Sequence, residues 1–306
     1  MKKRSCTVTA AVVALFLMFA ACRTTLSSEK EKYVFGFSTG LTSSINAQLK
    51  ASISDVLRII TEKENIGFGT VYYPQVSDFD AAAKKGQVDF LLTESVSTFY
   101  HAYKNYDFKP FLTYSMYGNK MIKNCLYVKG DEYKTVESLK GKKVGLIASD
   151  YRYFFLREIT GTPPEKLFKP VWLKDSSSPF YALSTNNADA VFSSDYAYAY
   201  LKITNPALVK GVREIACSKP LFIVPVLYKK GTPKKVMDAI ANKMIGARTD
   251  KDLRKYHSLI NMVKLEYFPM TEKDTAPGLE RIGAAIKNGW KRDYDKWYAE
   301  TGKEEE

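Results

Sequence analysis

The sequence predicts an α/β protein of two lobes, each a mixed sheet flanked by helices. The first observation is a near-repeat: residues 84–95 and 184–195 both run from a helix end through a polar turn and an Asp into a short apolar strand. Both segments then stop on small hydroxyl and acidic residues. Ligands of open α/β sheets collect at the carboxyl ends of such strands, so one such end in each half predicts two lobes facing a cleft. The plainer alternative is that any α/β protein repeats strand–turn–helix units.

Size and charge agree with this fold class. A chain of 306 residues is long enough for two domains that each bury a core. Its net charge of +13 favours an anionic partner, namely nucleic acid, lipid headgroups or a small anionic ligand. Lys and Arg are scattered along the chain without a nucleic-acid-binding motif, so we expect no nucleic acid.

The N-terminus predicts export and lipid anchoring. Three basic residues precede an apolar run at residues 8–19, which is shorter than the ~20 residues that span a bilayer. Two alanines and Cys22 follow, as in a bacterial lipobox, so we expect a signal peptide at 1–21, lipidation of Cys22 and a polar tether at 22–32. The mature protein would then be held on the periplasmic or extracellular face of the cell membrane. The alternative is an ordinary secretory signal with an incidental Cys.

The first lobe is expected to be discontinuous, made of residues 33–118 and 223–300. Helical periodicity and apolar runs alternate along it. Asp78 is a candidate helix cap, Thr232 with Pro233 is a candidate helix start, and the late helix at 279–297 is expected to pack on this lobe. The predicted strands are 33–37, 67–73, the apolar segment 90–92 after Asp89, and 110–117. The predicted helices are 45–64, 78–85, 97–103 and 233–245.

The second lobe is expected at residues 119–222. A strand at 125–128 comes first, and a basic glycine turn at 140–143 then leads into an apolar strand that ends at Ser149 and Asp150. A helix follows from about Tyr151 to Thr160. The second copy of the near-repeat closes this lobe.

Two cysteines remain in the mature chain beside Cys22. In an oxidising compartment Cys125 and Cys217 can form a disulfide that closes a loop of about 90 residues. Each lies beside a predicted crossover between the lobes. Two buried free thiols are the alternative.

Short motifs in this order resemble the substrate-binding lipoproteins of phosphate, phosphite and phosphonate ABC transporters. The matching segments are Gly86–Phe90, Leu139–Val144, Asp189–Ala190 and Ser218–Pro220. The resemblance covers roughly residues 33–290. It implies the type II periplasmic-binding-protein fold, with two lobes joined by two crossing strands and closing on a ligand like a hinge. It also implies an ABC permease as partner, and we expect a monomer.

The resemblance implies a binding site between the lobes. The family's anion site is a hydroxyl-rich turn at a helix start, where free N–H groups suit an oxyanion. Here Asp150 departs from the family's Ser/Thr run, and its charge would repel an anion. Arg152 could offset this charge by binding two oxygens of the oxyanion. If Glu94 and Asp195 both line the cleft, the ligand also carries a cationic group; each acid could instead be a helix cap or a salt-bridge partner. The candidate ligand-binding residues are Ser38, Thr39, Thr93, Glu94, Ser95 and Tyr100 on the first lobe and Ser149, Tyr151, Arg152, Ser194 and Asp195 on the second.

Enzymatic motifs are missing from the sequence. Its two histidines, His101 and His257, stand in no metal-spaced cluster, and there is no nucleophile elbow or Walker loop. We therefore expect a non-enzyme without cofactor or metal. Together with the resemblance, this predicts a protein that captures a small anionic or zwitterionic solute for an ABC importer, with phosphonate or phosphate favoured. The alternatives are a receptor lipoprotein that presents a solute to a membrane signalling partner, or a periplasmic enzyme on the same fold.

Overall fold

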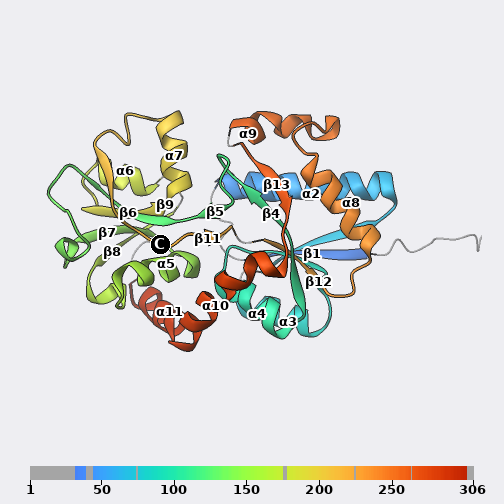
Figure 1. Cartoon of the computed structure of the whole chain (residues 1–306), viewed down its shortest axis with the longest axis horizontal. Helices are drawn as coiled ribbons and strands as arrows, with labels where there is room; N and C mark the ends of the chain where they lie inside the picture. The colour runs from blue at the N-terminus through green and yellow to red at the C-terminus, as the bar shows by residue number, and fades with distance from the viewer. Residues whose placement is uncertain are drawn as a thin grey trace, which may run out of the picture.

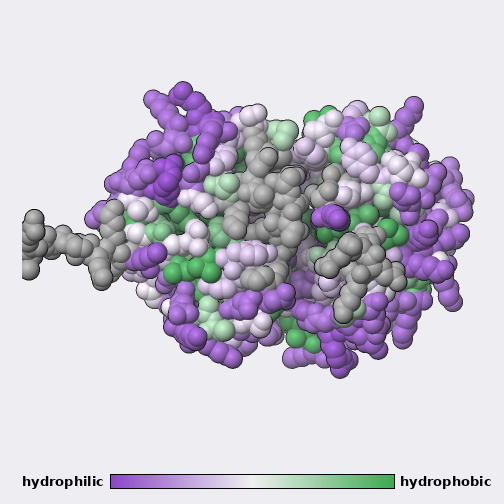
Figure 2. All heavy atoms as spheres, turned by 180° about the vertical axis from the view of Figure 1, so that it is seen from behind, coloured by the Kyte–Doolittle hydropathy of each residue, from purple (hydrophilic) through white to green (hydrophobic). Residues whose placement is uncertain are grey.

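The computed structural model describes residues 32–38, 44–73, 75–174, 178–223, 225–262 and 264–301. The predictions for the signal peptide, Cys22, the tether up to residue 31 and Thr39 lie outside these residues. Within them the chain forms two lobes, each built on its own sheet (Figure 1). Polar side chains dominate the outer ends of both lobes, and hydrophobic ones appear nearer the middle of the molecule (Figure 2).

The first lobe contains a six-stranded mixed sheet in the order β13-β4-β12-β3-β1-β2. The pairs β1/β2 and β1/β3 are parallel, and the remaining pairs are antiparallel. Its core is rich in buried aromatic rings, including Phe35, Phe37 and Phe90. The strands are β1 (Lys32–Ser38), β2 (Gly67–Tyr73), β3 (Phe90–Leu92), β4 (Phe108–Ser115), β12 (Val226–Lys229) and β13 (Glu266–Pro269).

The second lobe contains a five-stranded mixed sheet in the order β10-β6-β9-β7-β8. Here β7 is parallel to both β8 and β9, while β6 is antiparallel to its two neighbours. The strands are β6 (Asn124–Lys129), β7 (Lys143–Ile147), β8 (Lys169–Leu173), β9 (Ala190–Ser194) and β10 (Val212–Cys217).

Two short crossing strands connect the lobes. β5 (Met121–Ile122) leads into the second lobe and β11 (Leu221–Phe222) leads back, and the two pair in antiparallel fashion between the sheets (Figure 1). The predicted class, two α/β lobes joined by two crossing strands, is thus confirmed. The exact lobe boundaries, 33–118 with 223–300 and 119–222, stay a prediction.

Helices cover both sheets and begin close to the predicted positions. Two predicted helix starts are wrong: Gln75 is the N-cap of α3, with Asp78 completing its capping box, and Pro233 rather than Thr232 is the N-cap of α8. Among the described residues, no helix is both long enough and apolar enough to cross a membrane. The helices are α2 (Ser44–Glu64), α3 (Val76–Lys84), α4 (Val96–Asn105), α8 (Lys234–Ile245) and α9 (His257–Met262) in the first lobe, and α5 (Asp150–Thr160), α6 (Ser178–Ser184) and α7 (Asp195–Thr204) in the second.

The two last helices form a C-terminal strap, α10 (Glu272–Lys287) and α11 (Trp290–Thr301), that touches both lobes. α10 packs on α4 and on the crossing strand β11, whereas α11 packs on α5 (Figure 1). Arg281 of α10 makes a two-pronged ion pair with Glu158 of α5, at 2.8 and 2.9 Å, and donates to the Pro220 carbonyl. The single helix predicted at 279–297 is wrong, because the chain forms two helices with a break between Lys287 and Trp290. The expectation that it packs on the first lobe holds for α10 but is wrong for α11.

Candidate functional site

Strand ends and helix starts of both lobes meet between the two sheets. α4 begins just after β3, α5 just after β7, and α7 directly after β9. α4 and α5 are in contact although they belong to different lobes. The free N–H groups of several helix starts thus lie at one place, which favours negative charge there.

A chain of buried hydroxyls runs through the first lobe's share of this region. Ser38 donates to Thr93, whose Oγ1 accepts the Ser95 N–H at 3.0 Å. Ser95 caps α4, because its Oγ accepts the Thr98 N–H at 3.1 Å. Ser38, Thr93 and Ser95 are at most 4% exposed. The structure brings these three predicted residues together, and they bond to one another.

Asp150 joins this hydroxyl chain from the second lobe. It is the first residue of α5 and only 7% exposed. Its Oδ2 accepts from Ser95 Oγ at 2.8 Å, from the Ser97 N–H at 3.3 Å and from Ser97 Oγ. One carboxylate therefore connects the start of α5 to the start of α4.

Arg152 is a cation placed between the lobes. It is partly buried, and its Nη1 is shielded from solvent with no hydrogen-bond partner among the described residues. Burial lowers the pKa of its guanidinium, while the Glu94 carboxylate acts in the opposite direction. A shielded guanidinium N–H without a partner is costly, so this group is suited to receive an anionic ligand atom.

Two tyrosine hydroxyls, those of Tyr151 and Tyr114, lie within electrostatic reach of Glu94, and that of Tyr151 also lies within reach of Arg152. Burial raises the pKa of Tyr151 well above its usual value, and neighbouring Tyr114, Glu94 and Tyr196 raise it further, while Arg152 lowers it. Burial and then Glu94 likewise raise the pKa of Tyr114, a residue of β4. These tyrosines stay protonated at neutral pH and can donate hydrogen bonds to an anion.

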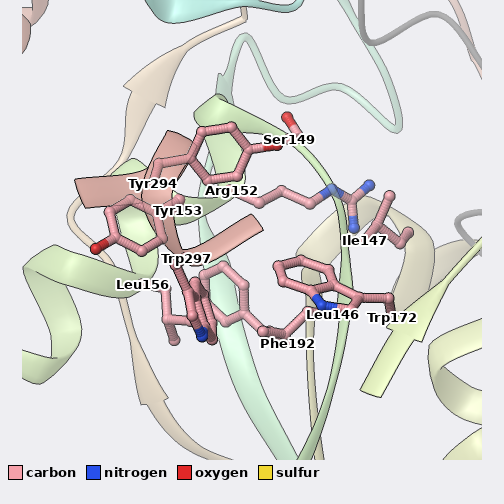
Figure 3. A pocket seen from close by; sticks show the side chains of 10 residues that line it. All are labelled: Leu146, Ile147, Ser149, Arg152, Tyr153, Leu156, Trp172, Phe192, Tyr294 and Trp297. Carbon is pink, nitrogen blue, oxygen red and sulfur yellow. The ribbon is translucent and has the colours of Figure 1, made fainter. Parts of the chain in front are cut away.

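A small, partly open pocket lined by aromatic rings, with a volume of about 10 Å³, lies beside Arg152 (Figure 3). Ser149 and Arg152 lie on its polar side, and the Arg152 guanidinium points toward Ile147 at the end of β7. β8 and α11 contribute Trp172, Tyr294 and Trp297 to its lining, and the Tyr294 ring lies beside Ser149. Ser149 makes no side-chain cap bond to α5.

The start of α7 places the last two predicted residues. Ser194 is its N-cap, and its Oγ accepts the Ala197 N–H at 3.2 Å. Asp195 donates its N–H to the Lys123 carbonyl at 3.1 Å, and its Oδ1 is buried without a hydrogen-bond partner among the described residues. Burial raises the pKa of the Asp195 carboxyl.

Tyr100 lies apart from these groups. It faces α10, where a Cβ added to Gly283 would come within 2.9 Å of the Tyr100 hydroxyl. The electrostatic group around Arg152 therefore includes Glu94 and Tyr151 from the predicted set but not Tyr100.

Sequence reasoning missed several residues of this region. Ser97, Tyr114 and Tyr196 were not predicted, and Asp150 was seen only as a misfit with the family pattern. One signal was available: Ser95, Ser97 and Thr98 form a hydroxyl run at a helix start, which is typical of anion contacts. Nothing in the local sequence of Tyr114 indicates that its hydroxyl lies near Glu94, and nothing in that of Tyr196 indicates that it lies near Tyr114 and Tyr151.

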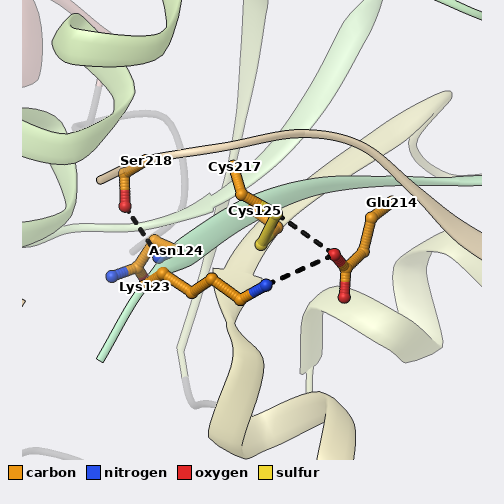
Figure 4. The surroundings of a disulfide bond; sticks show 6 residues. All are labelled: Lys123, Asn124, Cys125, Glu214, Cys217 and Ser218. Carbon is orange, nitrogen blue, oxygen red and sulfur yellow. Dashed lines mark hydrogen bonds and ion pairs between the residues drawn. A yellow bond between two sulfur atoms is a disulfide. The ribbon is translucent and has the colours of Figure 1, made fainter. Parts of the chain in front are cut away.

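A disulfide links strands β6 and β10 of the second lobe near the crossing strands (Figure 4). Cys125 and Cys217 stand opposite each other on β6 and β10 and are bonded. Beside them Asn124 and Ser218 exchange hydrogen bonds at 2.9 and 3.1 Å, and Lys123 pairs with Glu214 at 3.7 Å.

Comparison with known proteins gives a family and a fold. Residues 40–268 match the model of the periplasmic substrate-binding proteins of phosphonate ABC transporters. No curated protein matches the chain in sequence.

Three solved structures illustrate the shared fold. A binding protein component of a phosphonate ABC transporter from Pseudomonas aeruginosa has a TM-score of 0.59 at 11% identity, covering 90% of this chain and all (100%) of that one. PhnD1 from Prochlorococcus marinus, in complex with methylphosphonate, has a TM-score of 0.61 at 9% identity, covering 84% of this chain and 99% of that one. A protein from Xanthomonas citri bound to ATP has a TM-score of 0.61 at 14% identity, covering 87% of this chain and 98% of that one.

Proposed function

Because this chain belongs to the family of periplasmic substrate-binding proteins of phosphonate ABC transporters, we propose that it captures a small anionic or zwitterionic solute between its lobes. The solute is then handed to an ABC permease. A phosphonate or phosphate-like group is favoured, because the related protein from Prochlorococcus marinus holds methylphosphonate.

One observation carries the proposal: the shielded Arg152 Nη1 without a hydrogen-bond partner among the described residues. An arginine can bind two oxygens of a phosphonate, phosphate or carboxylate at once through its planar fork. The protonated hydroxyl of Tyr151 supplies a further donor near it, and that of Tyr114 lies near Tyr151. Four or five such bonds in a dry site are consistent with an affinity of about 1 µM, roughly −8 kcal/mol.

Two carboxylates support a zwitterionic solute. Glu94 acts electrostatically on Arg152, and Asp195 has a buried oxygen without a hydrogen-bond partner among the described residues. An amine on the solute would pair with either acid while its anionic group binds Arg152.

The test is a binding screen followed by one substitution. Methylphosphonate, an aminoalkylphosphonate, phosphate, carboxylates, amino acids and thiamine precursors are compared by thermal shift, and hits are measured by calorimetry. Arg152→Ala should weaken an anionic hit at least about tenfold, that is by ~1.4 kcal/mol or more. Arg58→Ala is the control, because Arg58 is exposed on α2 and pairs with Glu62.

The outcomes are separable. If no small solute raises the melting temperature, the capture function fails. An unchanged dissociation constant in Arg152→Ala would leave capture intact but remove Arg152 from the site.

Lipid anchoring through Cys22 is part of the proposal. The lipobox-like Ala20-Ala21-Cys22 supports it. Cys22→Ala should move the protein from the membrane fraction to the soluble fraction and abolish labelling by a radioactive fatty acid. Persistence of both in the variant would contradict the anchor.

A further inference from the structure

The starts of α4 and α5 face each other across the lobes and share one carboxylate. Asp150 Oδ2 accepts from Ser95 Oγ at 2.8 Å, from the Ser97 N–H at 3.3 Å and from Ser97 Oγ. Ser95 and Ser97 belong to the first lobe and Asp150 to the second. A helix start in one lobe is thus bonded by a side chain from the other.

These bonds place an anion where two positive helix ends converge. Each helix N-terminus carries a partial positive charge from its free N–H groups. The ion pairs found among the described residues do not include Asp150, so its compensation there comes from hydroxyls and helix ends. The Asp150 charge also acts on Tyr294 of α11, where it adds to burial in raising the pKa of that hydroxyl.

We infer that Asp150 is a built-in anion that holds the two lobes together when no solute is bound. It supplies to α4 the negative charge that a free anion would otherwise bring. The inference does not depend on which solute the protein captures, because the bonds lie within the chain. It predicts that the solute-free protein in solution keeps Ser95 and Asp150 in contact.

The experiment removes the carboxylate and offers a free one. Solute-free wild type and Asp150→Ala are compared by small-angle X-ray scattering, and the variant should have the larger radius of gyration. Sodium formate or inorganic phosphate should then raise the melting temperature of Asp150→Ala in a saturable manner and reduce its radius of gyration. Wild type, in which the position is filled, should show a smaller rise with formate than Asp150→Ala, since any formate bound at Arg152 stabilises both proteins alike, and sodium chloride at matched ionic strength sets the baseline.

Two further variants keep the test decisive. Asp238→Ala removes an equal charge from the exposed face of α8, where Asp238 pairs with Lys234, and should behave as wild type. Ser97→Ala retains the carboxylate but removes one donor; it serves if Asp150→Ala does not fold, and its radius of gyration should lie between those of wild type and an open form. The inference is overturned if solute-free wild type is already open, or if the foldable variants scatter like wild type and Asp150→Ala shows no formate response beyond that of wild type.

Discussion

Asp89 and Asp189 make the same pair of hydrogen bonds at equivalent places in the two sheets. The Asp89 N–H donates to the Val34 carbonyl at 2.9 Å, and the Val34 N–H donates to Asp89 Oδ2 at 2.7 Å. The Asp189 N–H donates to the Lys143 carbonyl at 2.9 Å, and the Lys143 N–H donates to Asp189 Oδ2 at 2.8 Å. In each lobe the Asp thus joins the start of one strand to the turn before its parallel neighbour.

Loss of the Asp89 carboxylate should destabilise the first lobe. Asp89→Ala leaves the Val34 N–H without its acceptor, at a cost of about 1–3 kcal/mol. Asp89→Asn keeps an oxygen acceptor and should lose less. Urea unfolding measures both, and equal midpoints for Asp89→Ala and wild type would contradict the role of this bond.

The stability of the solute-free protein should depend on the ionisation of Asp195. Burial raises the pKa of this carboxyl above its ordinary value of 3.8. The folded state therefore holds the proton more tightly than the unfolded state. The contribution of the Asp195 carboxyl to the free energy of unfolding is fully present below its pKa in the unfolded state. It is lost as the pH rises through its pKa in the folded state.

Asp195→Asn tests this pH dependence. The free energy of unfolding, measured in urea from about pH 4 upward, should fall less steeply in the variant than in wild type. Some slope should remain, because burial also raises the pKa of Asp89. Identical slopes for the two proteins would show that Asp195 does not contribute.

Gly278→Ala should destabilise the contact between the C-terminal strap and the crossing strand β11. In a helix interior Ala is normally favoured over Gly by ~1 kcal/mol. Here the new Cβ would lie 2.7 Å from Leu221 Cδ1 and closer still to Phe222, so overpacking should cost about 1–3 kcal/mol.

Gly283→Ala, on the same helix, is the matched control. Its nearest obstacle is the Tyr100 hydroxyl at 2.9 Å, which is the tip of a side chain and can shift. Melting temperatures should therefore fall further for Gly278→Ala than for Gly283→Ala. The reverse order would mean that α10 does not press on β11.

Removal of the disulfide should lower stability strongly. Cys125 and Cys217 are separated by 92 positions, and in the loop-entropy model such a cross-link stabilises by ~4–5 kcal/mol. The double variant Cys125→Ser/Cys217→Ser should unfold at lower urea, and reduced wild type should match it. Two free thiols titrated in unreduced wild type would contradict the bond.

The sequence was sufficient for the fold because its signals are local. The near-repeat around Asp89 and Asp189 is typical of a turn into a buried strand, and the alternation of strand and helix patterns located most strands of both sheets. The strands β8, β10 and β13 were not predicted. The helix starts at Gln75 and Pro233 were missed because they depend on capping geometry, which neighbouring Asp78 and Thr232 can imitate.

The candidate site was less predictable because it is assembled from distant segments. Ser38, Thr93 and Ser95 were expected to face a ligand, but they bond to one another and to Asp150. Whether a hydroxyl at a helix start is used internally depends on what the opposite lobe presents. Glu94, Tyr114 and Arg152 come from three elements, and no spacing in the chain links them.

The C-terminal strap also constrains the order in which the protein can fold during export. Tyr153 and Phe154 on α5 are covered by the rings of Trp290 and Trp297 in α11, a segment that is synthesised after the strands of both sheets. Until that segment has crossed the membrane, the strands of the second lobe can pair, but the aromatic face of α5 remains exposed to water. Folding intermediates of the second lobe would then be prone to aggregate. A nascent chain that stalls before residue 290 should therefore rely on chaperones in its new compartment.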